Sequence, residues 1–533
     1  MTSITPVRPP SLAALVARAA HLYGSRHALA GHVGLITYDE LDSLARRWAT
    51  ALRAHGVPEG GRVGILGNRS RVTYIGALAA AYAGTAFVPL NSRLHVDRIR
   101  RIAKLAELDA VIVAPDDIAL LETMLEDVGA AHVILAPESR LASRLGSAAG
   151  AVPWCDADAL PTVDLPPCLD PQPDWGCYLL FTSGTTGTPK GVLVTQGNVA
   201  AYLREARARF AFLPDDRFSQ MFEQSFDVSI FDLFVAWASG ACVHTLAAQQ
   251  LLAPASYIER EGITVYASVP SVLSLMKQRG ALRPDRFPAV RYSMFAGEAL
   301  SVENAKAWAA AAPNSRIENQ YGPTEATVVA TGFSWMATEA TSYPNCIVPI
   351  GKPFSGVTVR IVGEDGKDVT PGEAGELLVG GDQTVPGYWR DGMLTREKFV
   401  DGFYRTGDLV RSLPSGDLSF IGRVDDQLKV LGRRVEPAEI EAIARQVPEV
   451  TDAVVVGWPL EEGRPVALAL FILASGPSDD VATNVARHIS TQVEPFLIPR
   501  SVEVRSEFPL NANGKVDRRA LLATLQVSQL SSS

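Results

Sequence analysis

Apolar positions along the chain follow two spacings that alternate. An apolar residue every three or four positions marks residues 37–56 (TYDELDSLARRWATALRAHG), with Thr37 or Asp39 as candidate N-cap and Gly56 as candidate stop. Short continuous apolar runs follow at 62–67 (RVGILG), 109–115 and 131–137. Strands that alternate with helices in this way predict a mostly parallel sheet covered by helices.

The pattern of apolar and polar positions changes towards the C-terminus. A connection rich in Pro and Asp at 151–175 is followed by strand-like runs, and from about Pro349 short alternating runs predict a β-rich subdomain. A helix at 435–447 and strands at 451–458 and 466–473 predict a small α+β domain. The predicted fold class is therefore α/β. A large N-terminal domain (1–424) has parallel-rich sheets covered by helices plus the β-rich subdomain, and a small mobile α+β domain (425–533) follows.

One uncharged stretch, Val72 to Leu90, is long enough to span a bilayer. Its interior is mainly Ala, Gly, Thr and Tyr, and Gly84 and Pro89 interrupt it. These features favour a buried helix that ends near Gly84, followed by a strand at 85–90, over a membrane span.

Composition narrows the classes of function. The 533 residues are 47% hydrophobic and 20% charged, which excludes a disordered or low-complexity chain. The 49 Lys and Arg against 58 Asp and Glu give a net charge of −9, which argues against a nucleic-acid binder. Five scattered cysteines without CxxC spacing, and a start without a signal-peptide core, indicate a cytoplasmic protein.

The strongest chemical signal is TSGTTGTPKG at 182–191. Glycines let backbone N–H groups approach phosphate oxygens, hydroxyls add donors, and Lys190 adds positive charge. A Walker loop needs Ser or Thr after the lysine, and here Gly191 follows instead. The alternative is a flexible linker of small residues, which the position between two strand-like runs disfavours.

This loop resembles the phosphate-binding signature of the adenylate-forming superfamily, which includes peptide-synthetase adenylation domains, acyl- and aryl-CoA ligases and luciferases. The resemblance covers the chain from ITYDEL (36–41) to NANGKVDRRAL (511–521), with the motifs in order. It implies ATP and Mg²⁺ as cofactors. The implied ATP-binding residues are Thr182, Ser183, Gly184, Thr185, Thr186, Gly187, Lys190, Gly297, Asn319, Tyr321, Thr324, Asp408 and Arg423.

NQYGPTEATV (319–328) resembles the adenine and magnesium motif, and YRTGDLV (404–410) resembles the ribose motif. By that resemblance Tyr321 stacks on adenine, Asn319 meets its amino edge, and Asp408 accepts the ribose hydroxyls. Thr324 contacts the α-phosphate, and Glu325 holds the metal, as suits a hard cation. Taken alone, the first motif could equally be a turn before a helix.

The C-terminal motifs imply a hinge and a catalytic lysine. In GRVDDQ, Arg423 reaches the nucleotide and Asp425 falls at the hinge about which the small domain swings between adenylation and thiol transfer. Lys515 stands where the family keeps its catalytic lysine, and Thr324 and Glu325 complete the catalytic set. A cation there offsets the repulsion between the attacking carboxylate and the α-phosphate. Otherwise Asp425 is a solvated turn residue and Lys515 a surface lysine.

FDVS (226–229) separates the branches of the superfamily, because it resembles the motif in which an aspartate pairs with a substrate α-ammonium. A buried charge is costly unless paired, so Asp227 in this apolar run requires a cation. The alternative role is a helix cap. The residues carried over to the substrate pocket are Asp227, Val228, Phe231, Ser271, Met294, Ala296, Gln320, Val328, Val329 and Lys515.

This pocket has no ionised group besides Asp227 and Lys515, and bulky Met294, Phe231 and Gln320 shorten it. It predicts a small neutral L-α-amino acid: alanine, serine, glycine or 2-aminobutyrate first, valine or proline next. The predicted enzyme makes aminoacyl-AMP and passes the aminoacyl group to the phosphopantetheine thiol of a separate carrier protein. Only eighteen residues follow Lys515, so we expect a free-standing enzyme, and a monomer.

Three alternatives remain open. An acyl- or aryl-CoA ligase would leave Asp227 without an ammonium partner. A β-amino-acid enzyme is disfavoured by FDVS, and a non-catalytic nucleotide-binding protein by the presence of every chemical residue. An acidic carrier would dock on a local basic patch, for which Arg433 and Arg434 are candidates. The eight histidines fall in no motif and receive no role.

Overall fold

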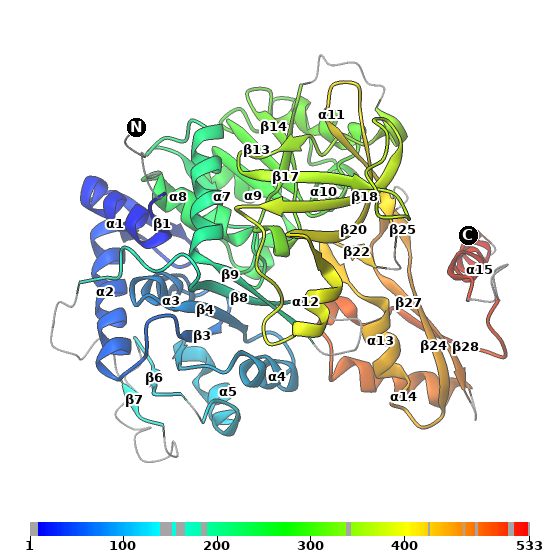
Figure 1. Ribbon diagram of the computed structural model, residues 1–533, viewed down its shortest axis with the longest axis horizontal. Coiled ribbons are helices and arrows are strands. Elements are labelled where there is room, and N and C mark those ends of the chain that lie inside the picture. Colours follow the sequence, from blue (N-terminus) through cyan, green and yellow to red (C-terminus); the bar gives the residue numbers. More distant parts are fainter. Residues whose placement is uncertain are drawn as a thin grey trace. The chain divides into compact units, whose positions relative to one another are not determined.

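The computed structural model describes residues 9–129, 131–138, 152–155, 166–182, 189–336, 343–424, 427–461, 464–474, 478–509 and 516–530. The chain forms two compact units (Figure 1). The first comprises Met1–Arg93, Ile102–Leu180 and Gly191–Val424, and the second comprises Leu94–Arg101, Phe181–Lys190 and Asp425–Ser533. Each is described separately.

The first unit is built on a nine-stranded sheet. Its order is β16 (Lys352–Pro353), β15 (Thr331–Trp335), β14 (Arg316–Tyr321), β13 (Tyr292–Ala296), β12 (Val265–Ser268), β10 (Arg217–Ser219), β11 (Cys242–Thr245), β1 (His27–Gly31) and β2 (Ile36–Thr37). The strands from β14 to β1 pair in parallel, and β2, β15 and β16 are antiparallel additions at the edges.

A second sheet of seven strands has the order β7 (Trp154–Cys155), β6 (Val133–Leu135), β5 (Ala110–Val113), β3 (Arg62–Gly67), β4 (Ala86–Asn91), β8 (Gly176–Thr182) and β9 (Lys190–Thr195). A third sheet, of five antiparallel strands, contains β17 (Val357–Val362), β18 (Ala374–Gly381), β20 (Phe403–Ser412), β19 (Phe399–Val400) and β21 (Leu418–Arg423). The predicted parallel-rich sheets and the β-rich subdomain are thus confirmed.

Helices follow the strands as the alternation predicts. They are α1 (Leu12–Tyr23), α2 (Tyr38–Ala54), α3 (Arg71–Tyr82), α4 (Val96–Ala106), α5 (Ile118–Glu122), α7 (Gln196–Arg209), α8 (Ala236–Ala238), α9 (Pro254–Glu261), α10 (Pro270–Gln278), α11 (Val302–Ala311) and α12 (Gly392–Lys398). Helix α2 begins with a capping box. The Thr37 side chain accepts the backbone N–H of Glu40, and the Glu40 side chain accepts the backbone N–H of Thr37. Figure 1 shows α2 and α3 side by side, and the two helices are in contact.

The uncharged stretch at 72–90 forms a buried helix and a strand, α3 and β4, as predicted. Every residue of α3 after Arg71 is buried, which explains the absence of charge. Among the described residues, no helix has both the length and the apolar character that a membrane crossing needs.

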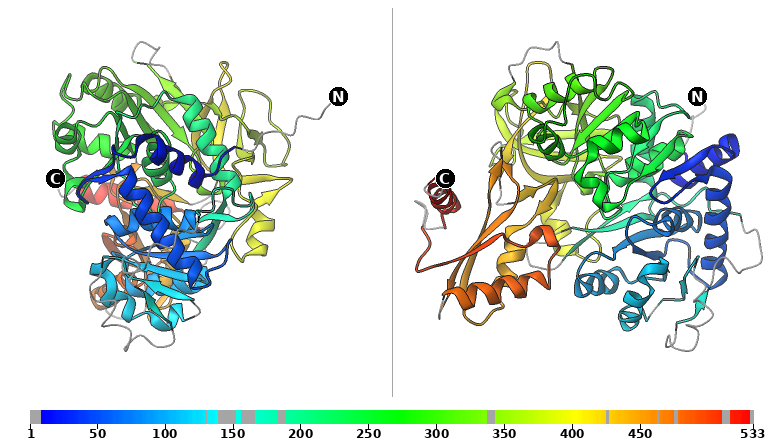
Figure 2. Two further views of the ribbon diagram at one scale, coloured as in Figure 1. Left: turned by 90° about the vertical axis from the view of Figure 1, so that its left-hand side faces the viewer. Right: turned by 180° about the vertical axis from the view of Figure 1, so that it is seen from behind.

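The second unit contains the small α+β domain (Figure 2). Its strands are β22 (Leu428–Val430), β23 (Arg433–Val435), β24 (Val450–Gly457), β25 (Leu460–Glu461), β26 (Arg464–Pro465), β27 (Leu468–Ala474) and β28 (Ser501–Arg505). Its helices are α13 (Pro437–Ala444), α14 (Ser478–Ser490) and α15 (Arg518–Leu530). Strand β24 alternates: Ala453 and Val455 join the core of α13 and α14, whereas Val454 and Val456 join that of α15. Helices therefore cover both faces of this sheet.

Candidate functional site

The ends of parallel strands position four of the predicted pocket residues. Strands β13 and β14 pair in register so that Ala296 lies beside Gln320, and Met294 lies one pleat earlier on β13. Ser271 is the second residue of α10, directly after β12, and its N–H donates to Glu298 Oε2 at 2.8 Å. The carboxyl ends of parallel strands are where open α/β sheets bind ligands, so this edge is a site by its topology.

Three predicted nucleotide residues form one hydrogen-bonded cluster. The Tyr321 hydroxyl donates to Asp408 Oδ2 at 2.5 Å, and Arg423 Nη1 donates to Oδ1 at 2.6 Å. Burial and the adjacent Asp408 charge raise the pKa of Tyr321 well above its ordinary value, so its proton stays in place. Nearby on β14, Asn319 donates to the carbonyls of Val348 and Pro349 at 3.0 and 2.9 Å. Its buried Oδ1 has no partner among the described residues and is an available acceptor.

Glu325 occupies the short 3₁₀ turn Thr324–Ala326 and is fully buried. The Tyr388 hydroxyl donates to Glu325 Oε1 at 2.7 Å. Within the described ranges no group of three or more His, Cys, Asp or Glu gathers around a metal-sized space. A lone buried carboxylate does fit Mg²⁺, because this ion is commonly held by one or two carboxylates together with the oxygens of a bound phosphate.

Asp227 is a buried carboxyl group whose ionised form is costly. It is 8% exposed, and its Oδ2 has no hydrogen-bond partner in the described part of the chain. Burial raises its pKa to about 7, with Glu325 adding to the rise and the Thr324 hydroxyl and the Val328 N–H opposing it. The Val228 N–H, next in the chain, opposes the rise as well.

The remaining predicted pocket residues are almost all buried. Met294, Val328 and Val329 are 3% exposed or less, and the Gln320 amide lies 3.7 Å from the Met294 sulfur. Val228 is half-buried. Phe231 contacts Phe212 and Phe218, with ring centroids 6.0 and 5.6 Å away, within an aromatic cluster. Its segment Phe231–Val235 forms a single π-helical turn, a feature frequent at functional sites.

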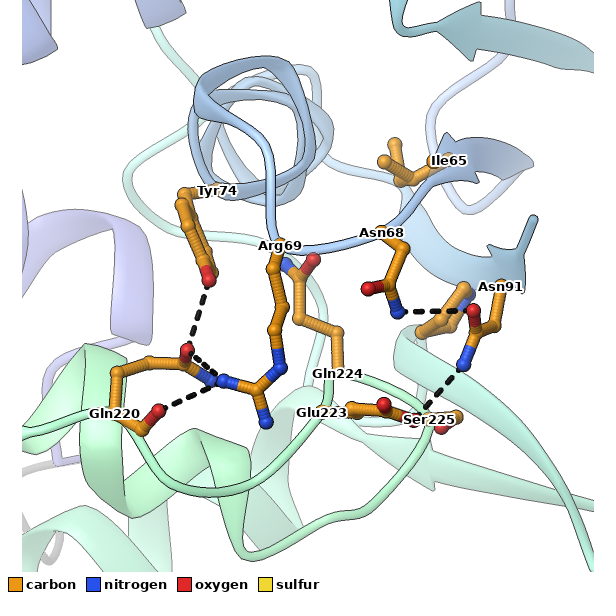
Figure 3. Close-up of a pocket in the computed structure, with 11 residues that line it drawn as sticks. Ile65, Asn68, Arg69, Tyr74, Asn91, Gln220, Glu223, Gln224 and Ser225 are labelled. Carbon is orange, nitrogen blue, oxygen red and sulfur yellow. Dashed lines mark hydrogen bonds between the residues drawn. The ribbon is translucent and has the colours of Figure 1, made fainter. Parts of the chain in front are cut away.

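A second network holds the segment that leads into Asp227 (Figure 3). Buried Arg69 donates to the carbonyls of Gln220 and Met221 at 3.0 and 2.6 Å, and to the Gln220 side chain at 2.9 Å. Tyr74 donates to the same side chain at 2.8 Å. From the other direction, buried Asp232 accepts the Phe222 N–H at 3.1 Å. The segment is thus fixed through both its carbonyl and its N–H groups.

The polar cavity in Figure 3 encloses about 10 Å³, space for about one water molecule. Asn68 donates to Asn91, and Asn91 donates to Glu223, both at 2.9 Å. In the close-up, Tyr74 and Arg69 point toward Gln220, and Asn68 points toward Asn91. A space of about 10 Å³ is too small for an organic substrate. The hydrogen bonds around this cavity support the segment that leads into Asp227.

Two predicted phosphate-loop residues belong to the second unit. Thr182 ends β8, and the buried Lys190 ammonium lies 3.4 Å from Glu436 of the same unit. Gly297, in the first unit, follows β13 with φ +88°, a conformation that suits glycine. The predicted residues Ser183, Gly184, Thr185, Thr186, Gly187, Asp425 and Lys515 lie outside the described residues.

The sequence motifs did not indicate Tyr388, Arg69, Asp232 or Gln383, which bond to predicted site residues or to the segments that lead into them. Asp232 offered a usable signal, because it is a second aspartate in the apolar run FDVSIFDLFVAW. The other three are polar residues without a motif or spacing of their own. Their partners are far away in sequence, so nothing local indicates them.

A buried aspartate in an apolar segment, and a hydrogen-bonded cluster of a tyrosine, an aspartate and an arginine, are typical of enzymes that activate a carboxylate as its adenylate. Residues 16–389 match the AMP-binding enzymes, and residues 439–515 match the AMP-binding enzyme C-terminal domain. The chain belongs to this family of adenylate-forming enzymes.

Relatives fall into two groups by length. The chain is 34% identical over 529 residues to an L-proline–[L-prolyl-carrier protein] ligase of Streptomyces coelicolor, covering 96% of each chain. It is also 33% identical over 503 residues to a probable non-canonical nonribosomal peptide synthetase of Salinispora arenicola, of which it spans only 6%. A solved structure, the Vibrio cholerae adenylation domain AlmE in complex with glycyl-adenosine-5'-phosphate, matches with TM-score 0.86 and 28% identity over 97% of each chain.

Proposed function

We propose that this protein activates a small neutral L-α-amino acid with ATP as aminoacyl-AMP and then transfers the aminoacyl group to the phosphopantetheine thiol of a carrier protein. Alanine, serine, glycine and 2-aminobutyrate are the first candidates, and valine and proline the next. Relatives named for proline–carrier-protein ligation and a neighbour crystallised with glycyl-AMP support this substrate class.

The observation that carries the proposal is the unpartnered carboxylate oxygen of Asp227. A buried anion without a partner is costly, and a substrate α-ammonium would supply the missing charge and hydrogen bonds. A plain fatty or aromatic acid offers no such group. Asp227 therefore favours an amino acid over the substrates of acyl- and aryl-CoA ligases.

The size of the substrate follows from the pocket walls. Met294, Val328 and Val329 are nearly inaccessible, and none of them can pair with a charged side chain. The contact between Gln320 and Met294 reduces the space further. A large or charged amino-acid side chain would have to displace these groups, so small neutral ones are favoured.

The chemistry has two steps. First, a carboxylate oxygen of the amino acid attacks the α-phosphorus of ATP, and pyrophosphate leaves with the electron pair of the broken P–O bond. Second, the carrier thiolate attacks the acyl carbon, and AMP leaves. The carboxylate is already ionised at neutral pH, so the first step needs no general base. In this proposal Tyr321 binds the adenine, and Asp408 with Arg423 orients the ribose.

Glu325 would hold Mg²⁺, which when bound lowers the negative charge on the phosphates. The Tyr388 hydroxyl orients this carboxylate. Lys515 would stabilise the charge that develops as two anions approach, and Asp425 would be the hinge between the two steps. Positioning and charge stabilisation therefore account for the whole first step.

The test is amino-acid-dependent ATP–pyrophosphate exchange with a panel of amino acids and with fatty, aromatic and β-amino acids. We expect exchange with small neutral α-amino acids, and loss of exchange in Asp227→Asn. A preference for phenylalanine or glutamate would refute the substrate class. Exchange only with fatty or aromatic acids would indicate a CoA ligase instead, and a β-amino-acid preference would move the ammonium site. Aminoacylation of a purified carrier protein, detected by mass spectrometry, tests the second step.

A further inference from the structure

Val328 and Val329, which the sequence assigns to the wall of the amino-acid pocket, belong to a strained turn. Thr327 and Val328 have φ of +55° and +66°, in the left-handed region that β-branched residues rarely adopt. The Val329 N–H donates to the Thr327 carbonyl at 2.8 Å, which closes a three-residue γ-turn around Val328. Such backbone persists only where the surroundings hold it, and it concentrates at ligand sites.

One side chain holds this turn. Gln383, in the loop that follows β18, is 0% exposed, and its amide Nε2 donates to the carbonyls of Ala326, Thr327 and Val329 at 3.4, 3.2 and 2.7 Å. In return, the Thr327 hydroxyl donates to the Gln383 carbonyl at 2.6 Å. The amide therefore contacts the turn on both sides of its strained residue.

Gln383 is itself fixed from a helix. Asn198 on α7 donates through Nδ2 to the carbonyls of Asp382 and Thr384, at 2.8 and 3.2 Å. The Oδ1 atom of Asn198 accepts from the backbone N–H and hydroxyl of Thr195 at the start of the helix. The helix start thus positions the residues on either side of Gln383.

The turn acts directly on the substrate pocket. Val328 and Val329, which the sequence assigns to this pocket, are 2% and 1% exposed, and the Val328 N–H interacts with the Asp227 carboxyl group. The backbone of Gly322 lies close against the turn, and only glycine fits there, because a Cβ on this residue would lie 2.6 Å from the Val328 carbonyl oxygen. If the turn relaxed, both the valine wall and the N–H that faces Asp227 would move.

We propose that Gln383 is a positioning residue that holds the Thr327–Val329 turn in its strained form, and so sets the size limit of the amino-acid pocket and the placement of Asp227. This inference rests on the amino-acid activation proposed above. Gln383 touches no substrate in this scheme, and its effect passes through Val328.

The test compares Gln383→Leu, which removes the amide donors at similar volume, with a matched control. The control is Gln196→Leu, because Gln196 is also a buried glutamine and donates to one carbonyl, that of Gly176, at 3.3 Å. Exchange kinetics give the KM for each amino acid and for ATP. We expect Gln383→Leu to raise the KM of the best amino acid by about tenfold and to relax its discrimination against the next larger side chain by about as much. The KM for ATP should change by less than about twofold in both variants.

Equal effects on the KM values for amino acid and ATP, or unchanged discrimination, would refute the inference and reduce Gln383 to a general stabilising residue. Asn198→Asp is a second variant, because it keeps the acceptor for the helix start and puts an oxygen in place of the donors to the Gln383 loop. It should shift the amino-acid KM in the same direction, and an unchanged value would count against the inference.

Failure of the proposed function is distinguishable. If the wild-type protein exchanges with no amino acid, that proposal fails, and the turn is then compared in crystal structures of the wild type and Gln383→Leu. Retention of a left-handed Val328 in the variant would refute the role of Gln383, and a relaxed turn would support it.

Discussion

Asn in place of Asp227 should make the free protein more stable while it disables the enzyme. In the free protein the Asp227 carboxylate is buried with an unpartnered oxygen, and its pKa is raised from the ordinary 3.8 to about 7. That difference of about three pH units, at about 1.36 kcal/mol each, corresponds to about 4 kcal/mol of destabilisation at pH 8. An asparagine amide must still be desolvated, so we expect a gain of about 2–4 kcal/mol.

The direction in which stability changes with pH follows from the raised pKa of Asp227. The native state binds the Asp227 proton more tightly than the unfolded state does, so the stability contributed by this proton is complete below about pH 4. It is lost as the pH rises through about 7. The difference between Asp227→Asn and the wild type should therefore grow by about 2–3 kcal/mol from pH 5 to pH 8, because the cost of burying the amide does not depend on pH.

The assay is denaturant unfolding of both proteins, without substrate, at pH 5 and pH 8. A variant less stable than the wild type at pH 8, or a gap that does not depend on pH, would refute the assignment of a buried, unpaired carboxylate. In parallel, the KM for the amino acid should rise at least about 30-fold in the variant, because a buried charge pair is lost. A preferred amino acid should raise the unfolding midpoint of the wild type at pH 8 and not that of the variant.

Three further outcomes are expected. Lys515→Ala should lower exchange by at least about 100-fold with ATP binding intact by calorimetry, and full exchange would remove Lys515 from the mechanism. Met294→Gly should move the preference in the amino-acid panel toward larger apolar side chains by about tenfold, and an unchanged profile would place Met294 outside the pocket. Tyr388→Phe should raise the Mg²⁺ concentration for half-maximal exchange by about tenfold, and should weaken Mn²⁺ binding to the ATP complex measured by electron paramagnetic resonance. Equal metal dependence in the two proteins would contradict the orienting role of Tyr388.

The sequence predicted the elements whose apolar pattern is strong. Helix α2 begins at the expected Thr37 cap, and β3 occupies the residues of the RVGILG run. The uncharged 72–90 stretch was also predicted correctly as a helix and a strand, because Gly84 and Pro89 argue against one continuous membrane-spanning helix. The run after Asp227 was less predictable, because a π-helical turn and an α-helix bury the same apolar residues.

The motif residues could be named as a set because they resemble the motifs of a known family. Tyr321, Asp408 and Arg423 are distant in the chain, yet they form one hydrogen-bonded cluster. The residues that support the site act on backbone groups instead. Gln383 and Arg69 bind carbonyls of distant segments, and any residue type could supply such carbonyls, so no sequence pattern records the pairing.

Several unfavourable features of the first unit lie in two segments that carry predicted pocket residues. Asp227 is a buried acid without a full set of partners, Asp232 lies buried five residues later, and Thr327 and Val328 adopt left-handed backbone. In the proposed scheme a bound α-ammonium would relieve the cost at Asp227. The unpaired Asp227 lowers the stability of the free protein. It can thereby increase selectivity for the correct substrate, because only a ligand with a cation at that point removes this cost.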